Sequence, residues 1–211
     1  ILSLSHCTDP DLVGGKAVGL ARLIAGGFPV PQGFCVTTEA YSQYIHASGF
    51  IVHEEWQRVG ALSGNERASV LAGCREQIRR IETSQLAAQC LTALQGLNQP
   101  PNTRWAVRSS ATNEDAAHTS FAGLYRTHLG VALSDIEAAL KDLWLSLWDE
   151  RVVSYQTRQS NPMAPRMAVV IQPMVEAQSA GVAYSIHPVT GRSNHVAINA
   201  VPGLAAPLVD G

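Results

Sequence analysis

Three short segments of the chain carry residue types that bind phosphate groups in proteins. Gly14-Gly15-Lys16 places a cation at the predicted start of a helix, where backbone N–H groups and the helix dipole favour an anion. Arg108 ends a predicted strand and can hold a phosphate through two parallel hydrogen bonds. Ser120-Phe121-Ala122-Gly123 combines small residues with a glycine, so its backbone N–H groups can approach phosphate oxygens closely.

Each segment alone also fits an ordinary structural role. A glycine pair before a lysine is most often a turn with a solvated side chain. Arg108 could instead pair with Glu114 or Asp115, and Ser120–Gly123 could be a plain tight turn. The G-x-x-x-x-G-K-[ST] pattern of a P-loop is absent from the sequence. The hypothesis of a polyphosphate site therefore depends on the three segments together.

Charge and composition narrow the class of protein. The 211 residues are 46% hydrophobic and 15% charged, with a net charge of −2, which is typical of a globular protein and disfavours nucleic acid or an anionic membrane as partner. No apolar run approaches the roughly 20 residues of a membrane span. We predict no metal-binding and no catalytic residue. Because the cysteines form no C-x-x-C pair, we expect a cytoplasmic protein with reduced core thiols at Cys7, Cys35, Cys74 and Cys90.

The pattern of apolar residues predicts a helical first part and a β-rich second part. Before residue 99 we expect a helix to Ala25, a strand at 33–36, a helix capped by Thr37 or Thr38, and two or three helices within residues 50–97. The two prolines of Gln99–Asn102 predict an exposed linker. Beyond it we expect a strand at 104–108, a polar loop at 109–119, a helix with a capping box of Ser134 and Glu137, and strands at 167–175, 181–186 and 195–201. This order predicts an α+β protein of two lobes, residues 1–99 and 100–211.

Longer strings around these segments resemble one known family. The string Ala106-Val-Arg-Ser-Ser-Ala-Thr-Asn-Glu-Asp115 is similar to the most diagnostic stretch of the pyruvate phosphate dikinase and phosphoenolpyruvate synthase family. The resemblance keeps the family's order and spacing over nearly all of the chain, and the rifampin phosphotransferase branch looks most similar. The other matching strings are Val13–Lys16, Pro29–Tyr41, Ser120–Gly123, Gln172–Val175 and Ala180–Val182.

The resemblance implies an ATP-grasp nucleotide-binding domain, incomplete at its C-terminal end, with ATP between two lobes. Lys16 and Arg108 would hold the phosphates. Gly123 and Thr127 would belong to the loop over the nucleotide, and Gln172 would face the adenine. The Mg²⁺ that accompanies ATP would be bound by residues outside this chain.

The resemblance further implies an ATP-dependent phosphotransferase, in which this domain passes a phosphoryl group to a histidine of a separate domain. The phosphohistidine would then serve pyruvate, rifampin or a related acceptor on a substrate domain, so the isolated chain is expected to be inactive. In one departure from the family, Ala205 and Ala206 stand where it usually has Gly-Glu. Two alternatives stay open: an ATP-using condensing enzyme with the same front domain, and a nucleotide-binding remnant without catalysis.

Overall fold

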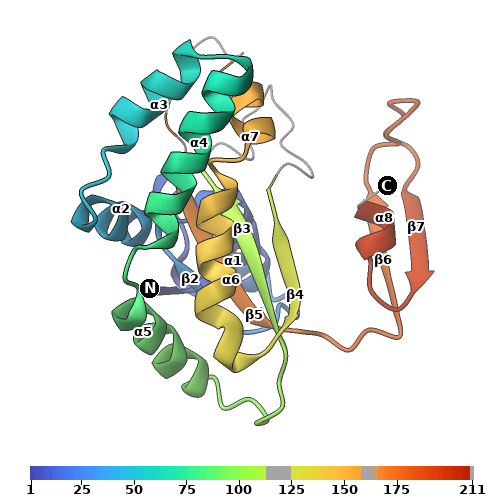
Figure 1. Ribbon diagram of the computed structural model, residues 1–211. Coiled ribbons are helices and arrows are strands. Elements are labelled where there is room, and N and C mark those ends of the chain that lie inside the picture. Colours follow the sequence, from blue (N-terminus) through green and yellow to red (C-terminus); the bar gives the residue numbers. More distant parts are fainter. Residues whose placement is uncertain (113–124, 158–163, 165, 210–211) are drawn as a thin grey trace. The chain divides into compact units, whose positions relative to one another are not determined.

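An antiparallel sheet of five strands lies at the centre of the larger of two units (Figure 1). The computed structural model describes residues 1–112, 125–157, 164 and 166–209, and the units are Ile1–Met174 and Val175–Gly211. The apolar run of β5, Met167–Pro173, suits a strand that is buried on both faces. In spatial order the strands are β1 Leu2–Ser3, β2 Phe34–Val36, β5 Met167–Pro173, β3 Trp105–Ala111 and β4 Thr127–Val131.

Helices cover both faces of this sheet, which confirms the predicted α+β class (Figure 1). Helix α1, Pro10–Ala25, packs on one face. The other face carries α2 Thr38–Ala47, α3 Val52–Ala61, α4 Gly64–Arg79, α5 Ser84–Gln95, α6 Ile136–Ser146 and α7 Glu150–Gln156. No helix in the described ranges is long and apolar enough to cross a membrane.

The core forms two layers because side chains alternate along each strand. On β5, Ala168 and Val170 belong to the small cluster under α1. Met167, Val169 and Ile171 belong to the larger cluster under the other helices. Directly opposite residues of antiparallel strands point to the same face, so β5 also shows which side chains of β3 face α1.

The units divide at a different place from the boundary predicted at Gln99–Asn102. That segment is an exposed connection, but β3 follows it and pairs with β5 along its whole length. Trp105 and Val107 of β3 also share one cluster of buried side chains with helices that precede the connection. A pair of prolines predicts an exposed turn, whereas long-range strand pairing decides whether the chain separates there.

The predicted end of the strand at Arg108 was wrong. β3 continues through Ser109 and Ser110 to Ala111, and these three residues are buried and paired with β5. The two hydroxyls indicated a polar loop. Serine is small enough to be enclosed inside a sheet when a neighbouring element can pack over it, and that information is tertiary.

The predicted capping box of α6 was also wrong. A short 3-10 turn, Leu133–Asp135, precedes the helix, and Ser134 Oγ bonds to the Asp135 side chain. Glu137 Oε1 accepts a hydrogen bond from Thr83 Oγ1 at 2.6 Å, so a tertiary contact replaces the local cap. The predicted buried stripe of this helix is confirmed at Ile136, Leu140, Leu143, Trp144 and Leu147.

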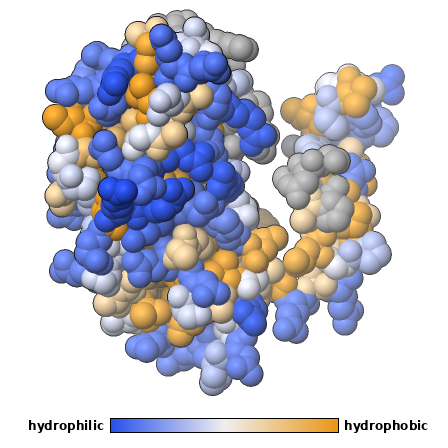
Figure 2. Space-filling view, in the orientation of Figure 1, coloured by the Kyte–Doolittle hydropathy of each residue, from blue (hydrophilic) through white to orange (hydrophobic). Residues whose placement is uncertain are grey.

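The second unit contains the predicted hairpin. Strands β6, Ser179–Tyr184, and β7, Ala197–Pro202, pair antiparallel, and the short helix α8 covers Ala206–Val209. Ala205 and Ala206 thus lie at the start of α8. Hydrophobic residues are visible on the surface of this unit in Figure 2, and the exposed apolar side chains include Val175, Tyr184, Ile186, Val189, Val196, Ile198 and Leu204.

The four cysteines are free thiols and all are buried, as the sequence predicted for Cys7, Cys35, Cys74 and Cys90. Burial raises the pKa of Cys74 to about 12 and that of Cys90 to about 11. Both thiols are therefore protonated near neutral pH, and a protonated thiol is a poor nucleophile.

Candidate functional site

Helix α1 is bent at Gly14, where it meets β3. Gly14 has φ 72° and ψ 164°, so the element is two helical segments joined at a kink. This backbone region is essentially restricted to glycine. The contact with β3 also requires glycine, because a Cβ atom at Gly14 would lie 2.2 Å from the carbonyl oxygen of Ser110. The helix predicted to begin at Gly14–Lys16 is thus the second segment, which follows a first turn at Pro10–Val13.

The hydroxyl of Ser110 holds this kink. Its Oγ donates to the carbonyl oxygen of Val13 at 2.7 Å and accepts from the N–H of Ala17 at 3.2 Å. In an unbroken helix the N–H of Ala17 would bond directly to the carbonyl of Val13. The serine hydroxyl is therefore inserted into one helical hydrogen bond and fastens α1 to the middle of β3.

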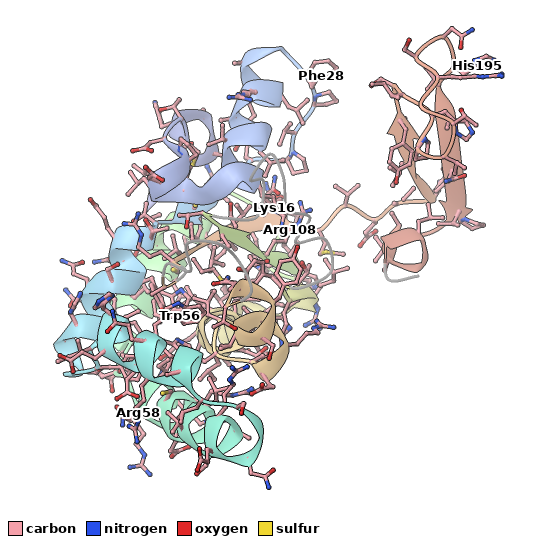
Figure 3. The ribbon with its side chains drawn as sticks, turned by 90° about the horizontal axis from the view of Figure 1, so that it is seen from above. Lys16, Phe28, Trp56, Arg58, Arg108 and His195 are labelled. Atoms are coloured by element: carbon pink, nitrogen blue, oxygen red, sulfur yellow. The ribbon has the colours of Figure 1, made fainter. Side chains whose placement is uncertain are left out.

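Lys16 lies just after the kink and reaches the same strand. Its Nζ donates to the carbonyl oxygen of Ser109 at 2.5 Å, and Ser109 directly follows Arg108. Figure 3 shows Lys16 and Arg108 close together where α1 meets the sheet, while Trp56 and Arg58 lie among the helices of the other side. Two neighbouring cations favour an anion that both can contact.

Strand register places two further predicted residues on the face of Arg108. Arg108 lies directly opposite Thr127 on β4 and Val170 on β5, and Val170 packs under α1. Gln172 is two residues from Val170 and therefore points to the same face. Thr127 is exposed, whereas Gln172 is only 6% exposed. Lys16, Arg108, Thr127 and Gln172 thus line one side of the sheet.

Gln172 has a protein partner in this arrangement. Its Nε2 donates to the carbonyl oxygen of Pro31 at 2.9 Å, which holds the amide beside the segment that leads into β2. Gly123, the remaining predicted residue, lies outside the described residues, as does the whole Ser120–Gly123 segment. The structure therefore places four of the five predicted residues on one face of the sheet.

Sequence reasoning assigned no role to Ser110. The sequence did contain a signal for it, because side chains alternate along a strand and Ser110 therefore lies on the same face as Arg108. A hydroxyl that is buried there needs a hydrogen-bond partner. Its neighbour Ser109 is equally buried, yet its Oγ has no partner within the described residues. Only the packing of α1 distinguishes the two serines.

An ion-pair network beside Thr127 fastens β4 to the helices α6 and α7. Arg126 Nη1 lies 2.7 Å from Asp142 Oδ1, and Arg126 Nη2 lies 2.9 Å from Asp149 Oδ2. His128 Nε2 lies 2.9 Å from Asp142 Oδ2. Burial opposes ionisation of Asp142, but hydrogen bonds and charge from Arg126 and His128 outweigh it and lower the pKa of that carboxyl. Both chain neighbours of Thr127 are held in this way.

The Arg126–Asp142 contact should make unfolding sensitive to acid. The pKa of Asp142 is lowered in the folded protein. The contribution of its carboxylate to the free energy of unfolding is therefore fully present above the ordinary carboxyl pKa of about 3.9, and it is lost as pH falls through the lowered value. We expect Asp142→Asn to cost about 1 kcal/mol or less near neutral pH, since partly exposed pairs are screened. Urea unfolding of both proteins across the acid range measures this cost. A cost that stays constant well below the ordinary carboxyl pKa would contradict the prediction.

An α+β unit in which a lysine and an arginine converge beside a glycine kink has the features of a domain that binds a phosphorylated ligand. Comparison with known families agrees. The family described as pyruvate phosphate dikinase, AMP/ATP-binding domain, matches residues 10–211. The chain belongs to this family, as the sequence motifs predicted.

Similar proteins carry several names. A phosphoenolpyruvate synthase of Aeropyrum pernix is 39% identical over 95% of this chain and 26% of its own length. The prodigiosin synthesizing transferase PigC of Serratia marcescens is 36% identical over 100% of this chain and 22% of its own length. The uncharacterized phosphotransferase YvkC of Bacillus subtilis is 30% identical over 95% of this chain and 22% of its own length. The chain thus spans about a quarter of the length of these relatives.

Proposed function

We propose that Lys16 and Arg108 hold the phosphates of ATP on the face of the sheet that α1 covers. The observation that carries the proposal is their convergence: Lys16 Nζ is held 2.5 Å from the carbonyl oxygen of the residue after Arg108. The second segment of α1 starts beside them, and the start of a helix favours an anion. Since the chain belongs to an AMP/ATP-binding family, ATP is the anion that fits.

In the same proposal, Thr127 and Gly123 border the phosphates and Gln172 faces the adenine. Thr127 lies directly opposite Arg108, which supports its proposed place beside the phosphates. The ion pairs of its neighbour Arg126 hold Thr127 in that position. The common face of Arg108 and Gln172 supports the adenine contact, with the bond to Pro31 orienting the amide. The part of Gly123 rests on the resemblance alone.

We further propose that the whole protein passes a phosphoryl group from ATP to a histidine of a separate domain, and then to pyruvate, rifampin or a related acceptor. Relatives named phosphoenolpyruvate synthase and phosphotransferase support this, and their greater length can hold such domains. The role of this chain would be to bind and orient ATP, because its described site offers cations and hydroxyls. The free, buried cysteines support a reducing compartment, the cytoplasm, for the reaction.

Magnesium commonly accompanies ATP and screens its phosphate oxygens. Within the described residues, no three His, Cys, Asp or Glu side chains converge to hold a metal ion. We therefore assign no magnesium ligand among the described residues and no step to the metal. The proposal places the metal ligands in another part of the longer protein.

A second candidate function is an ATP-using condensing enzyme. The similarity to PigC, named a prodigiosin synthesizing transferase, favours it. ATP would be bound in the same way, but it would activate a carbonyl or carboxylate of the substrate for condensation. A nucleotide-binding remnant is the third possibility, and only Ala205 and Ala206, in place of the Gly-Glu usual in the family, favour it.

The proposed transfer can be tested by incubating the whole protein with ATP labelled in its β- and γ-phosphates. We expect a label on the protein that is lost in acid and stable in alkali, as for phosphohistidine. Lys16→Ala should reduce the labelling rate at least about tenfold, and the isolated 211-residue chain should remain unlabelled. A whole protein that binds ATP tightly without ever becoming labelled would contradict the transfer and favour the condensing enzyme.

A further inference from the structure

Ser110 links the helix that carries Lys16 to the strand that carries Arg108. We propose that the Ser110 hydroxyl is a positioning residue for nucleotide binding, because it sets the place of Lys16 relative to Arg108. The inference rests on the proposed function, since it assumes that these two cations hold phosphate.

The hydroxyl bridges an interrupted helical hydrogen bond at the kink of α1. The backbone of Gly14 turns the chain so that the Val13 carbonyl and the Ala17 N–H no longer meet. Ser110 Oγ bridges them, with distances of 2.7 and 3.2 Å. An atom of β3 therefore fixes the angle between the two segments of α1 together with the backbone angles of Gly14.

The same strand positions both cations. Arg108 and Ser110 are two residues apart on β3, so their side chains share a face and their Cα atoms are about 7 Å apart. Lys16 directly precedes Ala17, and the Ser110 hydroxyl accepts a hydrogen bond from the N–H of Ala17. A change in the kink would therefore move Lys16 while Arg108 stays in the sheet.

The attachment of α1 to the sheet does not depend on this hydroxyl. Buried apolar residues of α1 pack against β5 of the sheet, and Thr38 Oγ1 at the start of α2 donates to the carbonyl of Asp11 in the first turn of α1 at 2.8 Å. Without the hydroxyl we expect a folded protein in which the kink is loose and Lys16 takes several positions. Binding a nucleotide would then have to order that side chain, which weakens affinity. The apolar residues in this contact are Val13, Ala17, Val18, Ala21, Ala168 and Val170.

The test compares dissociation constants for ATP measured on the whole protein. Ser110→Ala should weaken binding about tenfold, and Ser110→Thr, which keeps a hydroxyl, should restore most of the affinity. Ser146→Ala is the matched control. The Ser146 hydroxyl is also fully buried and donates to a helix carbonyl, that of Leu143, at 2.6 Å, but it lies in α6 on the other face of the sheet. This control should bind ATP as the unmodified protein does.

A double substitution separates positioning from general destabilisation, even if the threonine variant does not fold. If Ser110 acts through Lys16, Ser110→Ala should change affinity less than about twofold in a protein that already carries Lys16→Ala. A further tenfold loss in that background would overturn the proposal, and so would a folded Ser110→Ala protein with unchanged affinity. Unchanged affinity in Lys16→Ala alone would instead overturn the ATP site itself, and the positioning role with it.

Discussion

Replacing Lys16 or Arg108 by alanine should weaken ATP binding by the whole protein about 10- to 150-fold, because each change removes a charge-assisted contact worth about 1.5–3 kcal/mol. The unfolding midpoint should move much less, since neither side chain belongs to the two apolar clusters. Isothermal titration calorimetry measures the affinity, and thermal unfolding measures the stability of each variant.

Two matched controls remove the same charges elsewhere in the unit. Lys141 pairs with Glu137 at 3.4 Å on α6, and Arg58 pairs with Glu55 at 3.6 Å on α3. Both helices lie on the face of the sheet opposite to α1. Lys141→Ala and Arg58→Ala should therefore bind ATP as the unmodified protein does. If Lys16→Ala and Arg108→Ala behave like these controls, the assignment of both phosphate contacts is refuted.

Gly14→Ala should be the most destabilising single methyl addition in α1. The new Cβ would lie 2.2 Å from the Ser110 carbonyl oxygen, and the backbone angles of Gly14 are ones that alanine avoids. The backbone conformation alone costs about 1–3 kcal/mol, and relief of the overlap would separate α1 from β3. We expect a total loss above about 3 kcal/mol, measured as a lower urea midpoint or as failure to fold.

Gly19→Ala is the control for this change, in the same helix. A Cβ at Gly19 would meet nothing within 4 Å, and the residue is exposed on the second segment of α1. Alanine is the better helix former, so this variant should keep its stability or gain up to about 1 kcal/mol. Equal effects of the two substitutions would show that the kink at Gly14 is not required by its contact with β3.

Most elements of the fold could be predicted because they depend on local patterns. The apolar spacing of α6 and the apolar run of β5 both predicted the right element near the right place. The predictions that were wrong share one cause. The end of β3 and the cap of α6 were read from neighbouring residues, whereas the structure settles them by contacts with β5 and with Thr83. The boundary at Gln99–Asn102 differs for the same reason, since strand pairing crosses it.

The sequence by itself determined the α+β class, the family of the chain and the residue types of the candidate site, because these depend on composition, periodicity and ordered motifs. It could not show that Lys16 would reach the residue after Arg108, since they come from distant segments. Nor could it show that α1 would pack on the face of Ser110, whose hydroxyl bridges the kink, and not on the face of the equally buried Ser109. Only the tertiary structure decided these points. A hydrogen bond between distant segments depends on how α1 packs on β3, and adjacent side chains of a strand point to opposite faces.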